Sequence, residues 1–260
     1  MKKVAFSTGA FYTYDTLEAV RKLRKAGFEH MELMPQCHDD LSMGTLAEIK
    51  MQGMHISSIH YPLVFFGILY NANPGMMRES RMFSDNLAHF CEEAQTEYVV
   101  IHPEQEYQGR FADLVGKPIR ESIVYLASAL EKVGVTLAME NYPSGVGQHP
   151  DTLQAYVKEM GIPNMKIMVD TTEVIEGGGD PIEFIKGLDE APCHLHMSDF
   201  GHGQKHIPIG TGDVDWKAVV KTLKDKGYCG YYNLEPSYKY YIDDVDAQLR
   251  KDYEYITSLV

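Results

Sequence analysis

The segment LEKVGVTLAMEN, residues 130–141, contains one copy of the pattern that decides the fold. It passes from a helix-like segment through Gly134, a residue type that accepts the left-handed conformation found at many helix ends. It then enters a short run, Thr136–Glu140, that is apolar except at its ends. Short apolar runs bounded by turn residues are typical of buried strands. The segment therefore predicts a helix followed by a buried strand that ends in a carboxylate.

The same unit recurs in both directions along the chain. The predicted strands are Lys3–Ser7, His30–Leu33, Ser57–His60, Tyr98–His102, Thr136–Glu140, Lys166–Asp170, His194–Met197 and Tyr231–Glu235. The predicted helices are Thr16–Ala26, Thr45–Gln52, Met77–Ala94, Ile119–Val133, Asp151–Glu159, Pro181–Leu188, Trp216–Lys226 and Val245–Leu259. Asp15, Asp151 and Asp215 precede or begin three of these helices and are candidate N-caps. Eightfold alternation predicts an α/β fold, a closed (β/α)8 barrel, with a doubly wound open sheet as the alternative.

Length and composition agree with one globular domain spanning residues 1–260. Barrels of this kind commonly have about 250 residues, and the 260-residue chain has no linker-like or low-complexity stretch. Its 44% hydrophobic and 23% charged residues are sufficient for a substantial core. A net charge of −13 disfavours nucleic acid as a partner, because such binding relies on clustered Lys and Arg. No apolar stretch is long enough to span a membrane.

The four cysteines are scattered without a CxxC pair, at Cys37, Cys91, Cys193 and Cys229. Scattered thiols are typical of reduced, intracellular proteins rather than of a disulfide framework or a thiolate metal site. We therefore expect a cytoplasmic protein.

Polar side chains that bind metals fall at the ends of seven predicted strands: Glu32, His60, His102, Glu140, Asp170, His196 and Glu235. A barrel brings the carboxyl ends of its strands together at one mouth. Any one of these residues alone is more often a hydrogen-bonded structural group. Seven together indicate a cation that offsets their repulsion, since buried charges are normally paired or metal-bound. Carboxylate and imidazole without thiolate suit Mn, Co, Zn, Mg or Fe(II).

The order of these residues also resembles that of a known family. Glu140, Asp170, His196 and Glu235 end the last four strands, and the segment IGTGDVDW lies after the seventh strand, at 209–216. Together with Asn141 and the run HLHMSD at 194–199, they resemble the xylose isomerase-like barrel superfamily of sugar isomerases, epimerases and inosose dehydratases.

The resemblance implies that Glu140, Asp170, His196 and Glu235 bind one divalent ion, with Glu140 and Glu235 as the catalytic proton-transfer pair. The ion would polarise the carbonyl of a small sugar or polyol and stabilise an enediolate. A carboxylate would remove a proton and return it to another atom or face. The expected activity is that of an isomerase or epimerase. A dehydratase or lyase of the inosose or dehydroshikimate type is the alternative.

The superfamily also includes endonuclease IV-like enzymes, which use three zinc ions. His60, His102 and Glu140 match the ligands of one additional ion, so a second ion is an open alternative to a role for the two histidines in substrate binding. Endonuclease activity at apurinic sites is disfavoured by the acidic charge. A non-catalytic sugar-binding barrel is a further alternative, and a homo-oligomer is expected by analogy alone.

The ligands of a third ion are incomplete. That site would need a histidine at position 173 and an aspartate at 204, where this chain has Glu173 and Gln204. His206 is the one residue of that set that remains. Sugar epimerases similarly have a substrate-contacting histidine three residues after the aspartate. Glu173 departs from this pattern as well as from that of the third ion, and Glu173 and His206 are expected as substrate contacts.

Overall fold

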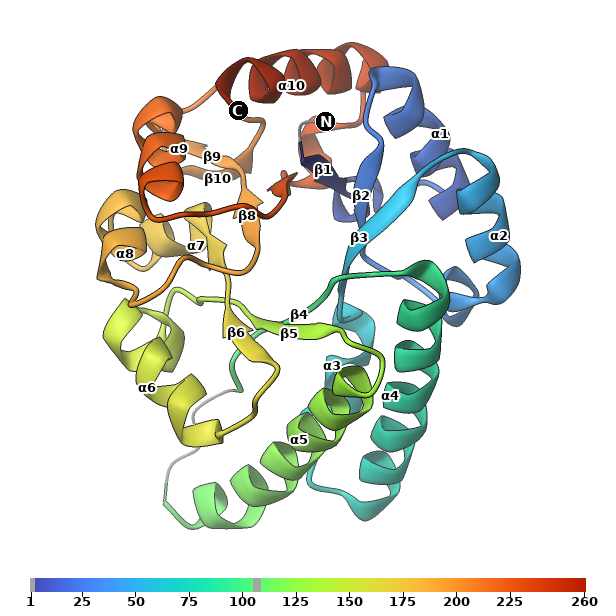
Figure 1. Cartoon of the computed structure of the whole chain (residues 1–260), viewed down its shortest axis with the longest axis vertical. Coiled ribbons are helices and arrows are strands. Elements are labelled where there is room, and N and C mark those ends of the chain that lie inside the picture. The colour runs from blue at the N-terminus through green and yellow to red at the C-terminus, as the bar shows by residue number, and fades with distance from the viewer. Residues whose placement is uncertain (1–2, 105–108) are drawn as a thin grey trace.

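The computed structural model describes residues 3–104 and 109–260 as a single barrel (Figure 1). Its parallel strands are β1 (Val4–Ser7), β2 (His30–Leu33), β3 (His55–His60), β4 (Tyr98–Ile101), β5 (Thr136–Met139), β6 (Met165–Ile167), β7 (Val169–Asp170), β8 (Leu195–Met197) and β11 (Tyr232–Leu234). They lie in the order β6-β5-β4-β3-β2-β1-β11-β8-β7. The prediction of a closed β/α barrel is confirmed, and the open sheet is excluded.

The nine strand segments make eight barrel strands, because β6 and β7 are consecutive parts of one strand. β6 pairs with β5, and β7 pairs with β8. Between them, the Met168 N–H donates to the Met139 carbonyl at 3.0 Å, and the Val169 N–H donates to the His194 carbonyl at 3.2 Å. The sixth strand thus changes partner at Met168 and closes the barrel.

Helices surround the barrel, with an α-helix after most strands (Figure 1). The described α-helices are α1 (Thr16–Ala26), α2 (Met43–Met51), α3 (Phe66–Leu69), α4 (Pro74–Ala94), α5 (Lys117–Glu131), α6 (Pro150–Met160), α7 (Thr171–Glu176), α8 (Pro181–Gly187), α9 (Trp216–Asp225) and α10 (Val245–Leu259). Asp15 and Asp215 cap α1 and α9 as predicted. The prediction for Asp151 was wrong: α6 begins at Pro150, so Asp151 lies in its first turn. None of the described helices is long and apolar enough to cross a membrane.

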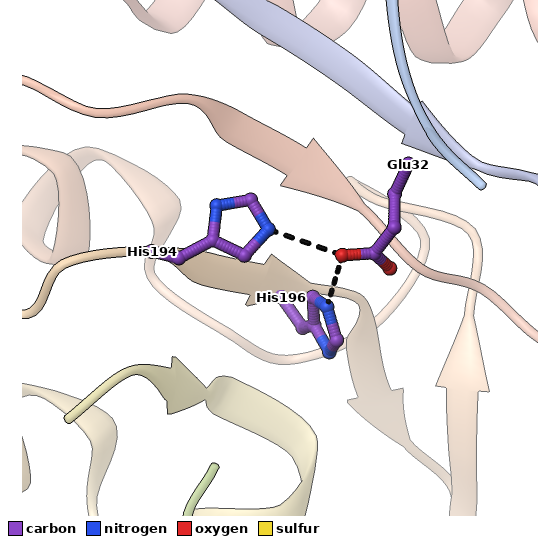
Figure 2. Close-up of side chains that lie close together, drawn as sticks. All are labelled: Glu32, His194 and His196. Atoms are coloured by element: carbon purple, nitrogen blue, oxygen red, sulfur yellow. Dashed lines mark hydrogen bonds and ion pairs between the residues drawn. The ribbon is translucent and has the colours of Figure 1, made fainter. Parts of the chain in front are cut away.

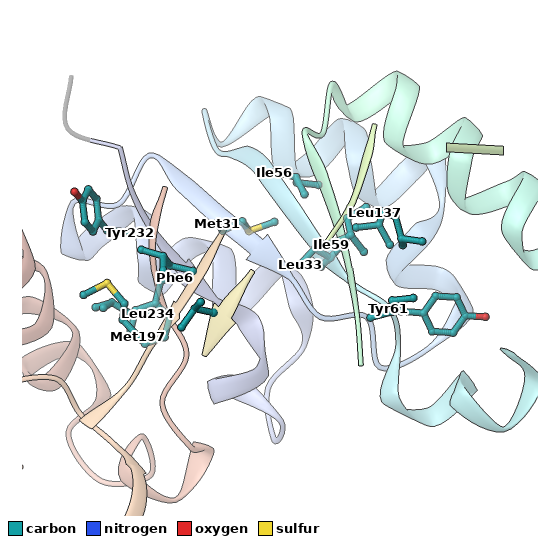
Figure 3. Close-up of a cluster of buried hydrophobic side chains, with 14 of the residues drawn as sticks. Phe6, Met31, Leu33, Ile56, Ile59, Tyr61, Leu137, Met197, Tyr232 and Leu234 are labelled. Carbon is teal, nitrogen blue, oxygen red and sulfur yellow. The ribbon is translucent and has the colours of Figure 1, made fainter. Parts of the chain in front are cut away.

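Alternation along the strands separates two environments. One face of each strand points to the helices and forms the main apolar core, which includes Met31, Leu33, Ile59, Leu137 and Leu234 (Figure 3). Side chains one position away point to the barrel interior, because successive strand residues face opposite sides. The interior holds a small apolar cluster of Val100, Ala138 and Met168. Polar groups occupy the interior towards the carboxyl ends of the strands.

An antiparallel hairpin, β9 (Asp199–Gly201) and β10 (Gln204–Ile207), extends from the end of β8 and was not predicted. Its two turn residues, His202 and Gly203, have φ values of 52° and 71°. Positive φ at both central residues is the backbone of a tight hairpin turn whose twist matches the flanking strands. The hairpin reverses the chain and returns His206 towards the barrel mouth.

Candidate metal centre

The four predicted metal ligands lie at the ends of four barrel strands and come together at one point. Glu140, Asp170, His196 and Glu235 each offer one ligand atom, and these atoms all lie within 4.8 Å of one another. His196 Nδ1 lies 2.7 Å from Glu235 Oε2, 3.0 Å from Glu140 Oε1 and 3.8 Å from Asp170 Oδ2. Three carboxylates and one imidazole nitrogen suit a hard or borderline divalent cation.

Asp170 presents one oxygen to this point and uses the other to begin a helix. Its Oδ1 accepts hydrogen bonds from the N–H groups of Thr172 at 2.6 Å and Glu173 at 2.9 Å, as the N-cap of α7. Its Oδ2 is buried without a hydrogen-bond partner among the described residues. Burial raises the pKa of this carboxyl to about 8, with Glu140 and Glu235 adding repulsion and His206 and His196 opposing it. Without a cation, the ionised form of Asp170 is therefore unfavourable.

Glu140 is buried against three histidines. Its Oε1 contacts His196 Nδ1, and its Oε2 lies 3.0 Å from His102 Nε2 and 3.6 Å from His60 Nε2. Burial alone would raise the pKa of Glu140, but the charges on His196 and His102 and their hydrogen bonds lower it well below its usual value. The carboxylate is therefore ionised at neutral pH.

His60 and His102 form a second group with Glu140 whose ligand atoms also lie within 4.8 Å. The two Nε2 atoms face each other at 3.3 Å. His60 Nδ1 donates to the Tyr61 carbonyl at 2.8 Å, and its Nε2 faces His102 and Glu140. Phe66 covers both rings, with centroid distances of 6.1 and 5.3 Å. The group is arranged for a shared proton or a second ion.

Glu173 and His206, predicted as substrate contacts, lie together beside the quartet. His206 Nε2 lies 3.1 Å from Glu173 Oε1, and its Nδ1 lies 3.0 Å from Ser198 Oγ. His206 has a left-handed backbone, with φ of 51°, a conformation uncommon outside glycine and often associated with functional sites. Gln204 instead accepts a hydrogen bond from Tyr240 Oη at 2.6 Å. An ion pair therefore occupies the position where the third ion's ligands would lie.

The residues present fit a bound cation, on the evidence of a buried atom that lacks a partner. Asp170 Oδ2 is buried without a hydrogen bond from any described residue. Buried carboxylate oxygens are normally paired or coordinated. Asp170 belongs to the quartet, so an ion bound there would satisfy this oxygen.

Sequence analysis placed Glu32 at the mouth but missed its partner His194. Glu32 Oε2 lies 3.1 Å from His194 Nε2 and 3.0 Å from His196 Nε2 (Figure 2). All three side chains are fully buried. The signal was present, since residues two apart in a strand face the same side, and His194 precedes His196 by two.

The β/α barrel and the carboxylates and histidines at its mouth define the class of protein. The sequence model of the family described as xylose isomerase-like TIM barrel matches residues 20–259. The chain therefore belongs to this family.

Two relatives of the chain are described as uncharacterized proteins. One protein of Methanocaldococcus jannaschii is 29% identical over 157 residues, covering 55% of this chain and 52% of that protein, so this match spans about half of the relative's length. Another protein of the same organism is 22% identical over 254 residues, covering 90% of this chain and 88% of that protein.

Solved structures share the fold over nearly the whole chain. The 3-keto-D-glucoside 4-epimerase YcjR from E. coli is similar with a TM-score of 0.79 at 15% identity, covering 99% of this chain and 100% of that one. The probable 3-DHS dehydratase AsbF from Bacillus anthracis is similar with a TM-score of 0.77 at 16% identity, covering 99% of each chain. At these identities the likeness establishes the fold alone.

Proposed function

We propose that the protein is a divalent-metal-dependent enzyme that isomerises or epimerises a small sugar or polyol by proton transfer. The observation that supports this most directly is the approach of Glu140 and Glu235 to the same nitrogen, His196 Nδ1, at 3.0 and 2.7 Å. They follow β5 and β11, which are separated by two barrel strands. Two carboxylates that reach one point from different strands suit removal of a proton from one position and its return to another.

The chain's own groups then have distinct roles. Glu140 and Glu235 would hold the ion and exchange the proton, while Asp170 and His196 would hold the ion only. A divalent ion bound there would polarise the sugar carbonyl and stabilise the charge that develops when the neighbouring carbon loses its proton. Glu235, with 13% of its side chain exposed against 3% for Glu140, is the more accessible carboxylate.

Polar groups next to the quartet would contact the sugar hydroxyls. The side chains of His102, Glu173 and His206 are 25%, 16% and 20% exposed, so each reaches the mouth. His60 lies beneath them and would orient His102. Imidazole and carboxylate groups donate and accept hydrogen bonds, as recognition of a polyol requires. Family membership and the likeness to an epimerase fold are consistent with this assignment.

The test combines metal analysis with proton exchange. Purified wild-type protein, Glu140→Gln and Glu235→Gln would be analysed for metal and incubated in D2O with Mn, Co, Zn or Mg and a panel of ketoses and inososes. NMR of the sugars follows deuterium uptake and product identity. Glu183→Gln is the control, because Glu183 is an exposed residue of α8.

We expect one ion per chain in the wild type and in the Glu183→Gln control. In the other two variants we expect a reduced metal content and exchange slower by about 10²–10⁴-fold, the range for loss of a general acid or base. Deuterium in an isomer or epimer supports the proposal, whereas a dehydrated product would redirect it to a lyase. Two ions per chain, one of them lost in His102→Gln, would place a second ion at His60, His102 and Glu140. Sugar binding without exchange, or no ion with any metal, would refute it.

A further inference from the structure

We propose that Glu32 is a positioning residue for the metal centre: its carboxylate holds His196 with Nε2–H towards β2 and the Nδ1 lone pair towards Glu140, Asp170 and Glu235. This inference rests on the proposed function in one respect, because it assumes that the quartet binds a divalent ion. The relevant side chains are shown in Figure 2.

Three donors converge on a single oxygen of Glu32. Its Oε2 accepts from Ser58 Oγ at 2.9 Å and lies 3.0 and 3.1 Å from the Nε2 atoms of His196 and His194. Ser58 is the direct neighbour of Glu32 in the β2–β3 register. His196 belongs to β8 and His194 directly precedes that strand, which lies across the barrel from β2. Glu32 thus connects two walls of the barrel beneath the quartet.

The orientation of the His196 ring depends on this contact. Its two nitrogens point in opposite directions, Nε2 to Glu32 and Nδ1 to the quartet. His60 stacks on the ring at 6.0 Å, and His194 meets it edge-on at 5.6 Å, so the ring plane is fixed by packing. A rotation of the ring by about 180° within that plane would put a carbon atom where each nitrogen now lies. The Glu32 hydrogen bond distinguishes the two orientations, and a proton held on Nε2 leaves Nδ1 free as a ligand.

The burial of Glu32 argues against a merely structural role. The residue is 0% exposed, and its second oxygen has no hydrogen-bond partner among the described residues. A buried carboxylate costs several kcal/mol in desolvation, and apolar side chains usually fill such a position at least as well. Glu32 Oε2 instead contacts both histidines, so the carboxylate lies where it can act on His196.

A competing arrangement would place an ion in the lower group itself. Glu32, His194 and His196 also offer ligand atoms within 4.8 Å of one another. That ion would take His196 Nε2 and leave Nδ1 protonated, which would remove the only imidazole ligand of the quartet. The quartet offers three carboxylates against one in the lower group, and Asp170 Oδ2 is buried there without a hydrogen-bond partner among the described residues. The quartet is therefore the better site, and Glu32 acts on it through His196.

The experiment measures zinc affinity by chelator competition in Glu32→Gln and in Ser58→Ala. Glutamine keeps the shape and one acceptor oxygen but removes the charge. Alanine at 58 removes one hydrogen bond to the same Glu32 oxygen and leaves His196 untouched. We expect zinc binding to weaken by about 10- to 100-fold in Glu32→Gln, the range for loss of such a supporting carboxylate, and to stay near the wild-type value in Ser58→Ala.

A second readout separates positioning from general destabilisation. In the zinc-loaded wild type, ¹⁵N NMR of His196 should show zinc at Nδ1 and a strongly hydrogen-bonded proton at Nε2. In Glu32→Gln the Nε2 proton should exchange faster and resonate further upfield, while circular dichroism remains unchanged. A folded Glu32→Gln variant with wild-type affinity and the same His196 spectrum would overturn the inference.

Other outcomes distinguish it from the proposed function. An ion lost in His194→Phe but kept in Glu235→Gln would locate the ion in the lower group and refute the positioning role. A wild type that binds none of Zn, Mn, Co and Mg would refute both proposals. A wild type that binds zinc, depends on Glu32 for affinity and yet exchanges no sugar proton would refute the proposed function alone and support the role of Glu32.

Discussion

Asn141 and Asp170 exchange two hydrogen bonds across adjacent strands. The Asp170 N–H donates to Asn141 Oδ1 at 2.6 Å, and Asn141 Nδ2 donates to the Asp170 carbonyl at 3.1 Å. Both residues are buried. The side chain that follows Glu140 thus fixes the backbone of Asp170, and two of the four proposed ligands are held in register by one amide.

This relationship predicts the effect of Asn141→Ala. The substitution leaves the buried N–H of Asp170 without its hydrogen bond, which should lower the free energy of unfolding by about 1–3 kcal/mol and weaken metal binding. Asn164→Ala is a matched control, because Asn164 Nδ2 also donates to two backbone carbonyls, those of Ala127 and Val135. The control should lose comparable stability in urea unfolding but retain metal affinity. Equal metal affinity in both variants would contradict the prediction.

Sequence indicated the positions of the mouth residues because each follows a buried apolar run. Glu140 and Glu235 come directly after β5 and β11, as the pattern requires. The helix α7 was not predictable in this way. α7 begins at Thr171 without a loop, in a segment rich in β-branched residues that are weak helix formers, and the Asp170 cap makes this start possible.

The contacts between distant segments were equally hidden. Asp199 is fully buried and accepts hydrogen bonds from the N–H groups of Phe200, Gly210 and Val214 and from Trp216 Nε1. No periodic pattern predicts such an arrangement, because it depends on how the chain folds back after the hairpin. The arrangement explains the IGTGDVDW segment as structural: it attaches the loop before α9 to the end of β8.

Close packing in this loop predicts that Gly212→Ala is destabilising. A Cβ at Gly212 would overlap Asp199 Oδ1 and lie 2.5 Å from the Phe200 carbonyl oxygen. Overpacking of this kind typically costs about 1–3 kcal/mol. Gly67→Ala is the control, because a Cβ there meets nothing within 4 Å. Thermal unfolding should show a clear decrease in Tm for Gly212→Ala and little change for Gly67→Ala. A normal Tm for Gly212→Ala would show that the loop can move apart easily.

The Glu173–His206 ion pair should stabilise the metal-free protein in a pH-dependent way. Burial alone would lower the pKa of His206, but Glu173 with Asp170 and Glu235 raises it to about 9. Because the folded-state pKa exceeds the ordinary histidine value of about 6.5, the stabilisation is complete below that pH and is lost as pH rises through about 9.

A double-mutant cycle with Glu173→Gln and His206→Asn measures the pair directly. Asparagine is chosen because it tolerates the left-handed backbone of residue 206. In chelator we expect a coupling free energy of about 1–3 kcal/mol at pH 6, as for hydrogen bonds to charged groups, and almost none at pH 10. A coupling independent of pH would mean that the interaction does not depend on the charge of His206.

Asp170→Asn should change stability in opposite directions with and without metal. Asparagine retains the oxygen that caps α7 but removes the ionisable carboxyl group. Burial raises the pKa of this carboxyl to about 8. An acid with a raised folded-state pKa makes the folded protein less stable as pH rises from about 4 to about 8. In chelator at pH 9 the variant should therefore be more stable than the wild type, by at least about 1 kcal/mol given that each pKa unit corresponds to about 1.4 kcal/mol.

Zinc should reverse this order. The wild type should gain about 2.7 kcal/mol at a free zinc concentration of about 100 times its dissociation constant, whereas Asp170→Asn, lacking a ligand, should gain little. Asp180→Asn is the control, because Asp180 caps α8 through the same kind of N–H contacts but lies exposed. This substitution should change neither the stability of the metal-free protein nor the stability gained with zinc. If Asp170→Asn instead destabilised the metal-free protein, Asp170 would be a structural cap whose charge is already compensated. Urea unfolding at pH 9 with and without zinc therefore separates the two roles of Asp170, as a metal ligand and as a helix cap.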